Sequence, residues 1–310
     1  MNQPDFSIIV VNWNTRDLLR QCLASVYSEP AEVTLDVIVV DNGSSDDSQE
    51  MVRREFPAVR LVENEANVGF AAANNQAMRI ALGRIFLLLN SDAYLLPGAL
   101  DKLARFMDSA PQAAVVGPQV LNPDGTIQPS CFRFPTLLDI GFESFFLTRL
   151  FPRSDLFNRR NLGGFDRRSL REVDWVSGAC LAVRREVAEE AGPMDEGFFM
   201  YAEEADWCLR IRESGHRIFF YPGAEGIHHG GQSAKHIRAE MLPRGFASRF
   251  RYFEKHYGRG YARAIRLLTV GGMLLRIVAS LIAWPCIRSP EVASRIKGYA
   301  NVVREILVHF

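Results

Sequence analysis

The feature that most constrains the fold is a run of five apolar residues, Ile85–Leu89, that ends in the polar tripeptide Asn90-Ser91-Asp92. Gly83 before the run and Pro97-Gly98 after it bound a predicted strand that is buried on both faces. Such strands occur in parallel sheets with helices on each side, where ligands bind beyond the carboxyl ends of the strands. We therefore expect the tripeptide at the rim of a binding site. The alternative is that Asp92 serves only as a helix cap or turn residue.

Apolar runs and stretches with helical periodicity alternate through the first 117 residues. The sequence predicts strands at residues 6–11, 35–40, 59–62, 85–89 and 113–117, with helices beginning near residues 15, 46, 71 and 97. Alternation at this spacing indicates parallel βαβ units. The predicted fold class is therefore α/β, with a mostly parallel central sheet flanked by helices and a helical C-terminal tail.

The pattern changes after Pro118. Residues 132–164 mix aromatic residues, proline and arginine without periodicity, which predicts a loop-rich insertion. A helix opens near Phe198 and ends at Gly215. Further strands are predicted at residues 173–183, 217–221 and 226–228. The expected organisation is one domain over residues 1–234, with halves at about 1–117 and 118–234, followed by a basic, partly apolar helical tail at 235–310.

The charge of the chain is divided between its body and its tail. Overall, 36 Lys and Arg balance 36 Asp and Glu. Residues 235–310, however, carry 14 Lys and Arg against 4 Asp and Glu, whereas residues 1–234 carry 22 against 32. A basic tail predicts an anionic partner, either a membrane surface or a phosphate-bearing substrate. No motif of interleaved aromatic and basic residues accompanies this charge, so we expect no nucleic acid partner.

The expected location follows from the tail and from the cysteines. Residues 264–287 are mostly apolar but contain Arg266 and Arg276. A spanning helix needs about 20 apolar residues without central charge, so we expect this helix to lie in a membrane interface, the alternative being a helix packed on the body. Five cysteines without a CxxC pair, and an N-terminus without signal-peptide features, indicate the cytoplasm. We expect a cytoplasmic protein that is peripheral on the inner face of the cytoplasmic membrane.

Carboxylates and one imidazole supply the candidate chemistry. Asp41 and Asp92 each follow a predicted strand at one rim, and Glu203-Glu204 opens a helix on which Glu203 and Asp206 share a face. Asp92 and His228 supply two ligands, too few for structural zinc but suited to an octahedral Mg²⁺ or Mn²⁺ completed by diphosphate oxygens and water. No GxxxxGK[ST] motif occurs and no GxGxxG follows the first strand, which argues against NTPases and dinucleotide-dependent dehydrogenases.

An ordered set of short motifs runs through residues 6–235. In chain order they are Val10-Val11-Asn12-Trp13-Asn14, Val39-Val40-Asp41-Asn42-Gly43-Ser44, Asn67-Val68-Gly69-Phe70, Asn74, Leu89-Asn90-Ser91-Asp92, Val176-Ser177-Gly178-Ala179, Asp195-Glu196-Gly197-Phe198-Phe199, Tyr201-Ala202-Glu203-Glu204-Ala205-Asp206 and His228. The set resembles glycosyltransferase family 2, in particular the branch of bacterial rhamnosyltransferases and other cell-surface glycan transferases. This resemblance implies a GT-A fold, with a nucleotide-sugar half at about 1–117 and an acceptor and catalytic half at 118–234.

The resemblance also implies roles for individual residues. Asp41 contacts a pyrimidine base, and Asn90-Ser91-Asp92 replaces the metal-binding Asp-x-Asp of the family, with Asp92 and His228 as metal ligands. The implied donor-binding residues are Val11, Asn12, Asp41, Asn67, Gly69, Asn74, Asn90 and Ser91. Glu204 stands where many relatives have Asp and is the expected general base, with Glu203 and Asp206 as alternatives.

Three residues are candidates for acceptor binding. Trp175 and Trp207 either stack on sugar rings or pack in the core, and Gly178 lets an acceptor approach the backbone closely. The predicted enzyme is an inverting, metal-assisted glycosyltransferase that uses a dTDP- or UDP-linked sugar, with dTDP-rhamnose among the candidates. Its expected acceptor is a hydroxyl of a glycan or of a lipid-linked glycan. The alternatives are a sugar-nucleotide nucleotidyltransferase and a non-catalytic sugar-nucleotide-binding module.

Overall fold

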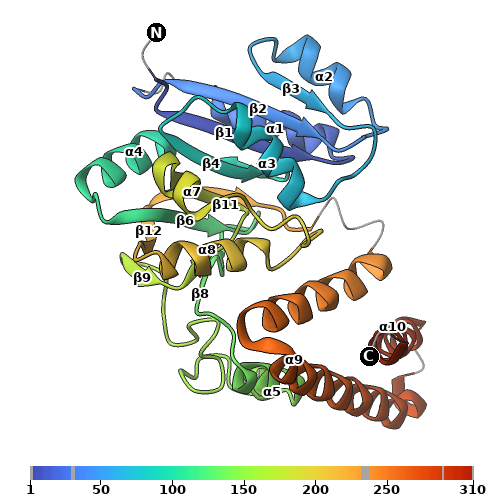
Figure 1. Cartoon of the computed structure of the whole chain (residues 1–310). Helices are drawn as coiled ribbons and strands as arrows, with labels where there is room; N and C mark the ends of the chain where they lie inside the picture. The colour runs from blue at the N-terminus through green and yellow to red at the C-terminus, as the bar shows by residue number, and fades with distance from the viewer. Residues whose placement is uncertain (1–2, 29–31, 232–237, 288–289, 309–310) are drawn as a thin grey trace. The chain divides into compact units, whose positions relative to one another are not determined.

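The computed structural model describes residues 3–28, 32–231, 238–287 and 290–308 (Figure 1). The chain forms two compact units, Met1–Phe134 with Asp166–His236, and Pro135–Phe165 with Ile237–Phe310. The elements of the first unit are β1 (Phe6–Asn12), α1 (Arg16–Val26), β2 (Leu35–Asp41), α2 (Ser48–Glu55), β3 (Arg60–Glu63), α3 (Phe70–Ile80), β4 (Ile85–Asn90), β5 (Ala93–Leu95), α4 (Ala99–Ser109), β6 (Ala113–Leu121), β7 (Ile127–Gln128), β8 (Cys131–Phe132), β9 (Arg171–Val173), β10 (Trp175–Val176), β11 (Cys180–Arg184), α7 (Arg185–Ala191), α8 (Glu203–Glu213) and β12 (Arg217–His228). Those of the second unit are α5 (Leu137–Ser144), α6 (Leu147–Leu150), α9 (Arg238–Ile287) and α10 (Pro290–Val308).

The first unit is built on a ten-stranded mixed sheet in the order β3-β2-β1-β4-β11-β6-β12-β5, with β7 beside β6 and β9 beside β12. Strands β3, β2, β1 and β4 are parallel, as are β6 and β12, whereas β11 runs antiparallel to both of its neighbours. Figure 1 shows β1, β2 and β4 side by side. The predicted α/β class with a mostly parallel central sheet and a helical C-terminal tail is confirmed.

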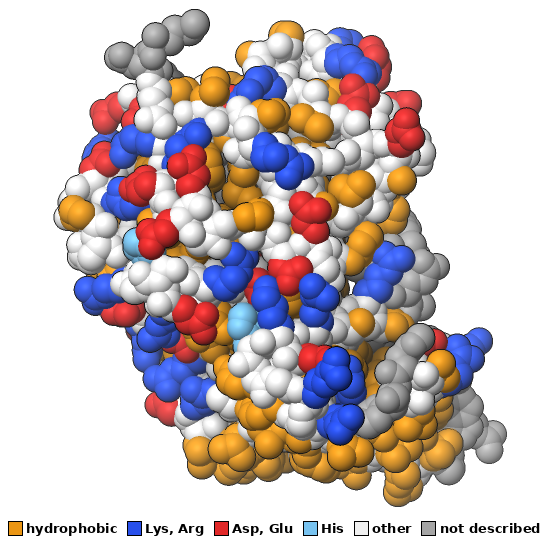
Figure 2. All heavy atoms as spheres, viewed as in Figure 1, with side chains coloured by type: hydrophobic (Ala, Val, Ile, Leu, Met, Phe, Trp, Pro, Cys, Tyr) orange, Lys and Arg blue, Asp and Glu red, His pale blue; other side chains and the backbone are white. Residues whose placement is uncertain are grey.

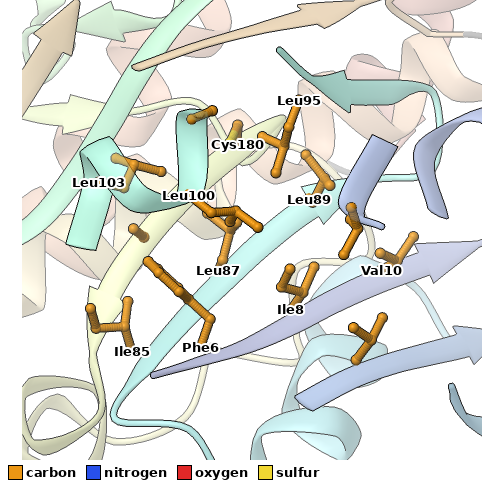
Figure 3. Packing of buried hydrophobic residues seen from close by; sticks show 14 of the residues in the cluster. Phe6, Ile8, Val10, Ile85, Leu87, Leu89, Leu95, Leu100, Leu103 and Cys180 are labelled. Atoms are coloured by element: carbon orange, nitrogen blue, oxygen red, sulfur yellow. The ribbon is translucent and has the colours of Figure 1, made fainter. Parts of the chain in front are cut away.

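The core lies on the central strands because alternation along each strand sends apolar side chains to both faces. On one face, alternate residues of β1 and β4 pack with leucines of α4 (Figure 3). The labelled members of this cluster are Phe6, Ile8, Val10, Ile85, Leu87, Leu89, Leu95, Leu100, Leu103 and Cys180. On the opposite face, Ile9 and Leu88 are also fully buried. Burial on both faces explains the continuous apolar runs of these strands.

Two strand predictions differ from the structure in detail. The strands predicted at 217–221 and 226–228 are one strand, β12, whose pairing with β6 shifts between Tyr221 and Glu225. Pro222 lies in this irregularity and has no N–H to donate, which is the usual place for proline inside a sheet. The strand character predicted over 173–183 is divided among β9, β10 and β11, and Ser177-Gly178-Ala179 forms the loop between the last two.

The predicted loop-rich insertion contains two helices of the second unit. Thr136 begins α5 with a capping box, because its hydroxyl accepts from the Asp139 N–H while the Asp139 carboxylate accepts from the Thr136 N–H. The carboxylate of Glu143, on α5, is paired with Arg249 of α9 at 3.2 Å and with Arg160 at 3.5 Å. Residues 135–165 thus group with the C-terminal helices. The predicted domain boundary at 234/235 lies outside the described residues.

Candidate active site

The carboxyl ends of three strands meet at one edge of the sheet. Asn12, the last residue of β1, lies opposite Asp41, the last residue of β2, and Val11 lies opposite Asn90, the last residue of β4. Asn12 and Asp41 are buried, whereas Val11 and Asn90 are half-buried. Parallel pairing in register therefore brings four of the predicted site residues together.

Asp41 is surrounded by hydrogen-bond donors of the protein. Its Oδ2 accepts from Asn12 Nδ2 at 2.8 Å, and its Oδ1 accepts from the Ser44 N–H at 2.9 Å and from Gln49 Nε2 at 2.8 Å. A carboxylate offers about four acceptor positions. Among the described residues these three hydrogen bonds fix the carboxylate and fill three of the four positions, so that the fourth, on Oδ2, could accept from a further donor.

A chain of hydroxyl and amide hydrogen bonds links the end of β4 to Asp41. Thr15 donates its hydroxyl to Asn12 Oδ1 at 2.7 Å, so at the 2.8 Å contact between the Ser91 and Thr15 hydroxyls it is Ser91 that donates. Ser91 is 3% exposed. The hydroxyl of Ser91 therefore joins the ends of β4 and β1, and the Thr15 side chain takes part in this chain of hydrogen bonds rather than capping α1.

The loop before α3 is shaped by Gly69. Its backbone has φ +90° and ψ 168°, a conformation that only glycine adopts readily, and a Cβ at this position would lie 2.6 Å from the carbonyl oxygen of Phe199. The same carbonyl accepts from the Phe70 N–H at 2.8 Å. Asn67 Oδ1 accepts from the Gly69 N–H at 2.9 Å. Gly69 thus brings the segment before α8 against the start of α3.

The adjacent asparagines of α3 have different tasks. Asn74 donates to the Phe70 carbonyl of its own helix at 2.9 Å. Asn75 donates to the Met194 carbonyl and accepts from the Met194 N–H, both at 2.9 Å, and so ties α3 to the segment before α8. The sequence motifs include Asn74 alone, whereas the tertiary contacts show that Asn75 makes the long-range connection.

Asp92 and His228 face each other across the antiparallel pairing of β5 with the end of β12. Asp92 Oδ1 lies 3.1 Å from His228 Nε2, and Asn90 Nδ2 lies 3.3 Å from the same nitrogen. Both Asp92 and His228 are largely buried. Adjacent ligands of an octahedral ion at about 2.1 Å stand about 3.0 Å apart, so this pair has the spacing of two neighbouring metal ligands.

Gln128, which no sequence motif indicates, sets the orientation of the imidazole. His228 Nδ1 lies 2.7 Å from Gln128 Oε1, and the Gln128 amide donates to Asn122 Oδ1 at 2.8 Å and to the His228 carbonyl at 3.2 Å. These two donated bonds identify Oε1 as the acceptor, so Nδ1 carries the proton. Nε2 is then the nitrogen that can hold a metal. Gln128 lies on a two-residue strand after a turn, where no sequence pattern marks it.

Glu204 lies at the same edge as the strand ends. The Asn90 N–H donates to the Ala179 carbonyl at 3.1 Å, and a Cβ built on the neighbouring Gly178 would lie 4.0 Å from Glu204 Cβ and 3.4 Å from the ring of Phe70. Glu204 is half-buried. The structure therefore places Glu204 beside Gly178, next to the strand that leads into Asp92.

The other two carboxylates of α8 have different surroundings. Asp206 is fully buried and accepts from Arg210 Nε at 3.1 Å, while Arg210 also donates to the Ala191 and Pro193 carbonyls. Glu203 is 3% exposed, and its Oε2 has no hydrogen-bond partner within the part of the chain that the structure describes. Burial and the neighbouring Glu204 carboxylate raise the pKa of Glu203 well above its ordinary value.

The backbone before these carboxylates is strained. Tyr201 and Ala202 both have φ +71°, a left-handed conformation that costs about 1 kcal/mol or more for residues with a Cβ. Two consecutive residues of this kind set the start of α8 directly before Glu203. Strain of this kind concentrates at functional sites, where the surrounding contacts hold the backbone in place.

The two tryptophans belong to the core. Trp207 is fully buried and donates its indole N–H to the Gly192 carbonyl at 2.9 Å. Trp175 is 8% exposed, stacks on Phe132 with ring centres 4.3 Å apart and donates to the Arg133 carbonyl at 3.1 Å. Stacking on a sugar needs an open ring face, so the expected acceptor role of Trp207 is wrong. For Trp175 the contacts favour the packing alternative.

A sequence model of one family, described as glycosyl transferase family 2, matches residues 7–191, more than half of the chain. The chain belongs to glycosyl transferase family 2. This family 2 glycosyltransferase uses a sugar-nucleotide donor, which decides against the nucleotidyltransferase alternative.

The family 2 glycosyltransferase is similar to curated proteins along most of its length. It is 28% identical to the N-acetylglucosaminyl-diphospho-decaprenol L-rhamnosyltransferase of Mycobacterium tuberculosis over 281 residues, which cover 87% of this chain and 90% of the relative. It is 25% identical to the low-salt glycan biosynthesis hexosyltransferase Agl10 of Haloferax volcanii over 285 residues, 88% of this chain and 85% of the relative. The resemblance to rhamnosyltransferases and glycan transferases is thereby confirmed.

Solved structures show the same fold. A mannosyltransferase from Pyrobaculum calidifontis, in complex with GDP-Man and Mn²⁺, has a TM-score of 0.52 at 20% identity, over 99% of this chain and 87% of that one. GalNAc-T7 with UDP, GalNAc and Mn²⁺ has a TM-score of 0.55 at 17% identity, over 73% of this chain and 44% of that one. The transferase thus has the GT-A fold.

Proposed function

We propose that the transferase inverts the anomeric centre of a dTDP- or UDP-linked sugar, dTDP-rhamnose among them, while moving it to a hydroxyl of a lipid-linked glycan. The observation that carries this proposal is the meeting of three groups at one edge of the sheet. Asp92 and His228 lie 3.1 Å apart, the buried carboxylate of Asp41 ends the second strand, and Glu204 lies beside Gly178. Each group supplies one requirement of sugar transfer.

The nucleotide half of the donor fits the strand ends of β1 and β2. The free acceptor position on Asp41 Oδ2 suits the N3–H of uracil or thymine, since both bases present the same donor. Val11 and Asn12 of β1 pair with the end of β2 beside this position, and Asn42, the residue after Asp41, donates to Asn67 Oδ1 at 3.3 Å and to the Gly69 carbonyl at 3.4 Å. Asn74 and Ser91, whose polar groups already bond within the protein, support the site rather than reach the donor.

Asp92 and His228 are the residues that fit a divalent ion, Mg²⁺ or Mn²⁺. Their spacing suits adjacent ligands, and Gln128 orients Nε2 toward Asp92. Within the described ranges no group of three or more His, Cys, Asp and Glu gathers, so other ligands, such as diphosphate oxygens and water, would have to complete the shell of a bound ion. When bound, the ion neutralises the charge that develops on the departing diphosphate. Both GT-A structures compared above contain Mn²⁺.

Glu204 is the candidate general base. Its half-buried carboxylate lies beside Gly178, where the absence of a side chain leaves room for an acceptor. As the acceptor oxygen bonds to the anomeric carbon, Glu204 takes the hydroxyl proton and the bond from that carbon to the diphosphate oxygen breaks on the opposite side. Asp206 is occupied by Arg210, and the raised pKa of Glu203 disfavours its ionised form. The contacts therefore support Glu204 over both alternatives.

A lipid-linked acceptor and a membrane location are supported by the second unit. The stretch Pro243–Ile282 of α9 is long and apolar enough to cross a membrane by length and composition, and 22% of its most apolar window is buried. Arg276, inside this stretch, donates to the Ser144 and Glu143 carbonyls of α5. A helix that is tied to the protein along one side and apolar along the other suits the interface of a bilayer rather than a crossing. The name of the mycobacterial relative gives N-acetylglucosaminyl-diphospho-decaprenol as its acceptor.

The donor site is tested by thermal shift with nucleoside-diphosphate sugars, with and without Mn²⁺. We expect stabilisation by UDP- or dTDP-linked sugars that increases when Mn²⁺ is present, because an ion held by Asp92 and His228 would neutralise the charge of the diphosphate. Stabilisation that ignores Mn²⁺ would contradict the metal assignment. Stabilisation by purine-linked sugars alone would contradict the role of Asp41.

The base is tested by Glu204→Gln, with the exposed Glu213→Gln at the other end of α8 as the matched control. We expect the first variant to bind donor normally but to transfer sugar roughly 10²–10⁴-fold more slowly, because the amide cannot take the proton. The control should transfer at the wild-type rate. Equal rates in the two variants would rule out Glu204 as the base.

A further inference from the structure

The second unit contains a cavity of about 670 Å³ that lies between α9 and α10. One wall is a single face of α9, since Ala247, Phe250, Arg251 and Glu254 occupy positions i, i+3, i+4 and i+7. The helix is interrupted at Gly258, where φ is +84°, and its second run contributes Arg266 to the lining. The volume is in the range of roughly 300–1,000 Å³ that is typical of small-molecule sites.

The lining is apolar on one side. Phe250 and, from α10, Val302 and Ile306 contribute to it, and all three are buried in the unit. The next residues of α10, Leu307 and Val308, are 62% and 70% exposed. The end of α10 is therefore apolar both in the buried lining, at Ile306, and on the exposed surface, at Leu307 and Val308.

The other side of the lining is basic. Arg244, Arg251 and Lys255 are exposed cations of the first run of α9, and Arg266 adds a fourth from the second run. Two carboxylates also line the cavity: Glu254, 3.4 Å from Arg266, and Glu305. Four cations against two carboxylates leave the lining with net positive charge. A neutral lipid would gain no binding energy from these cations, and a small soluble anion would gain none from the apolar side chains.

We propose that this cavity binds the phosphate or diphosphate ester of a membrane lipid. The anionic group lies against Arg251, Lys255 and their basic neighbours, and the first part of the hydrocarbon chain lies against Phe250 and Ile306. Figure 2 shows Lys and Arg side chains close to the hydrophobic face of the C-terminal helices, as an amphiphilic anion requires. The biological role rests on the proposed lipid-linked acceptor, while the binding itself is measured without sugar transfer.

Binding is tested by co-sedimentation of the full chain with vesicles of three compositions. These are phosphatidylcholine alone, phosphatidylcholine with phosphatidylglycerol, and phosphatidylcholine with a polyprenyl diphosphate at matched charge. We expect binding to both anionic vesicles and little to the neutral ones. A preference for the polyprenyl diphosphate identifies the acceptor lipid as the occupant, and equal binding identifies an ordinary anionic phospholipid. Inorganic diphosphate that competes as well as the lipid at equal concentration would overturn the proposal, because the apolar wall would then contribute nothing.

Two variants locate the site. Arg251→Gln with Lys255→Gln should weaken binding to anionic vesicles roughly ten- to thirty-fold. The matched control, Arg263→Gln with Lys297→Gln, removes the same charge from exposed positions of the same unit outside the lining. Ala247→Trp should also weaken binding by filling the cavity with all charges kept, whereas Ala300→Trp on the exposed side of α10 should not. Equal losses in both charge variants, or normal binding by Ala247→Trp, would overturn a site in this cavity.

A separate measurement distinguishes this proposal from the proposed function. Calorimetry of the wild-type chain with UDP and Mn²⁺ reports on the strand ends of the first unit. If the wild-type chain binds UDP with Mn²⁺ but the cavity variants bind vesicles as tightly as the wild type does, only the lipid site is overturned. A protein that binds lipid through the cavity but shows no Mn²⁺-dependent binding of nucleotide overturns the donor site alone.

Discussion

The carboxylates near the strand ends differ in how many hydrogen bonds they accept from other groups of the protein. Asp41 accepts three hydrogen bonds and Asp206 accepts from Arg210, so donors of the protein already occupy both carboxylates. Glu203 is buried beside another carboxylate, and an oxygen of its own lacks a partner among the described residues. Burial and the adjacent Glu204 carboxylate raise the pKa of Glu203, which favours its protonated form and disfavours two adjacent buried charges.

The raised pKa of Glu203 predicts how stability depends on pH. Above the ordinary value of 4.5, the unfolded chain releases this proton while the folded chain keeps it, so the contribution of Glu203 to stability falls as pH rises toward the folded pKa. We expect Glu203→Gln to raise Tm at about pH 8, roughly 2–4 °C for each kcal/mol, and to leave it unchanged at about pH 4. Calorimetric melts of both proteins across this range measure the difference. The exposed Glu213→Gln should shift Tm equally little at both pH values.

Gln128 predicts a separate effect on metal binding. Gln128→Leu removes the acceptor that holds the proton on His228 Nδ1, so the imidazole is free to rotate or to change tautomer. Affinity for Mn²⁺ in the presence of nucleotide should fall about 10–100-fold, as is typical when a partner of a metal-binding histidine is lost. Titration calorimetry measures this change. The exposed Gln112→Leu is the control, and an unchanged affinity in Gln128→Leu would exclude His228 as an oriented ligand.

At the scale of elements, the site depends on how α3 and the segment before α8 pack. The Phe199 carbonyl accepts from the Phe70 N–H, and Asn75 binds both backbone groups of Met194. These contacts join residues that are more than 100 positions apart in sequence. They bring the segment that leads into Glu204 against the loop before α3, which contains Asn67 and Gly69. This loop and the candidate base therefore belong to one packed arrangement.

Gly69→Ala tests this packing. A methyl group there would lie 2.6 Å from the Phe199 carbonyl oxygen, in a backbone conformation with φ +90° and ψ 168°. Gly98→Ala is the control, because Gly98 also has positive φ but its Cβ would meet only the flexible side chain of Lys102, at 3.8 Å. We expect Gly98→Ala to cost about 1–2 kcal/mol, the strain of the left-handed backbone, and Gly69→Ala to cost clearly more. Urea unfolding measures both, and equal costs would mean that the Phe199 contact is not maintained.

At the scale of the whole molecule, the two units differ in their surfaces. In the second run of α9, the apolar residues Leu267, Leu274, Val278 and Leu281 are 49–65% exposed, and their spacing by seven, four and three residues places them on one helical face. Figure 2 shows hydrophobic side chains gathered over the C-terminal helices. A soluble unit rarely leaves such a continuous apolar face in water, whereas the surface of a bilayer would cover it.

The exposed face predicts how the full chain binds vesicles. Leu281→Asn with Ile282→Asn should weaken binding to anionic vesicles roughly ten-fold or more, because two apolar side chains that are 54% and 73% exposed would no longer enter the interface. Leu82→Asn with Leu170→Asn, at exposed apolar positions of the first unit, should have no effect. Vesicle co-sedimentation compares the two. Equal binding by all proteins would show that this face does not meet the membrane.

The sequence by itself determined the class of fold and most of the strand ends. Buried parallel strands need apolar runs, and the polar residues that end them mark the binding edge, so Asn12, Asp41 and Asn90 could be placed in advance. The ordered motifs were also enough to indicate the family. These properties follow from local periodicity and from chain order, which the sequence contains directly.

The tertiary structure alone decided which hydrogen-bond partners the polar residues have and which side chains are buried. The pairing of β5 with β12 places Asp92 beside His228, and Gln128 selects the His228 tautomer with the proton on Nδ1. Trp207 is fully buried, so it cannot make the predicted stacking contact with a sugar. The structure also grouped residues 135–165 with the C-terminal helices. Hydrogen-bond partners and burial depend on contacts between segments far apart in the chain, and no local pattern records them. The residues at the strand ends of the first unit could therefore be predicted from the sequence, whereas their hydrogen-bond partners and burial depended on tertiary packing.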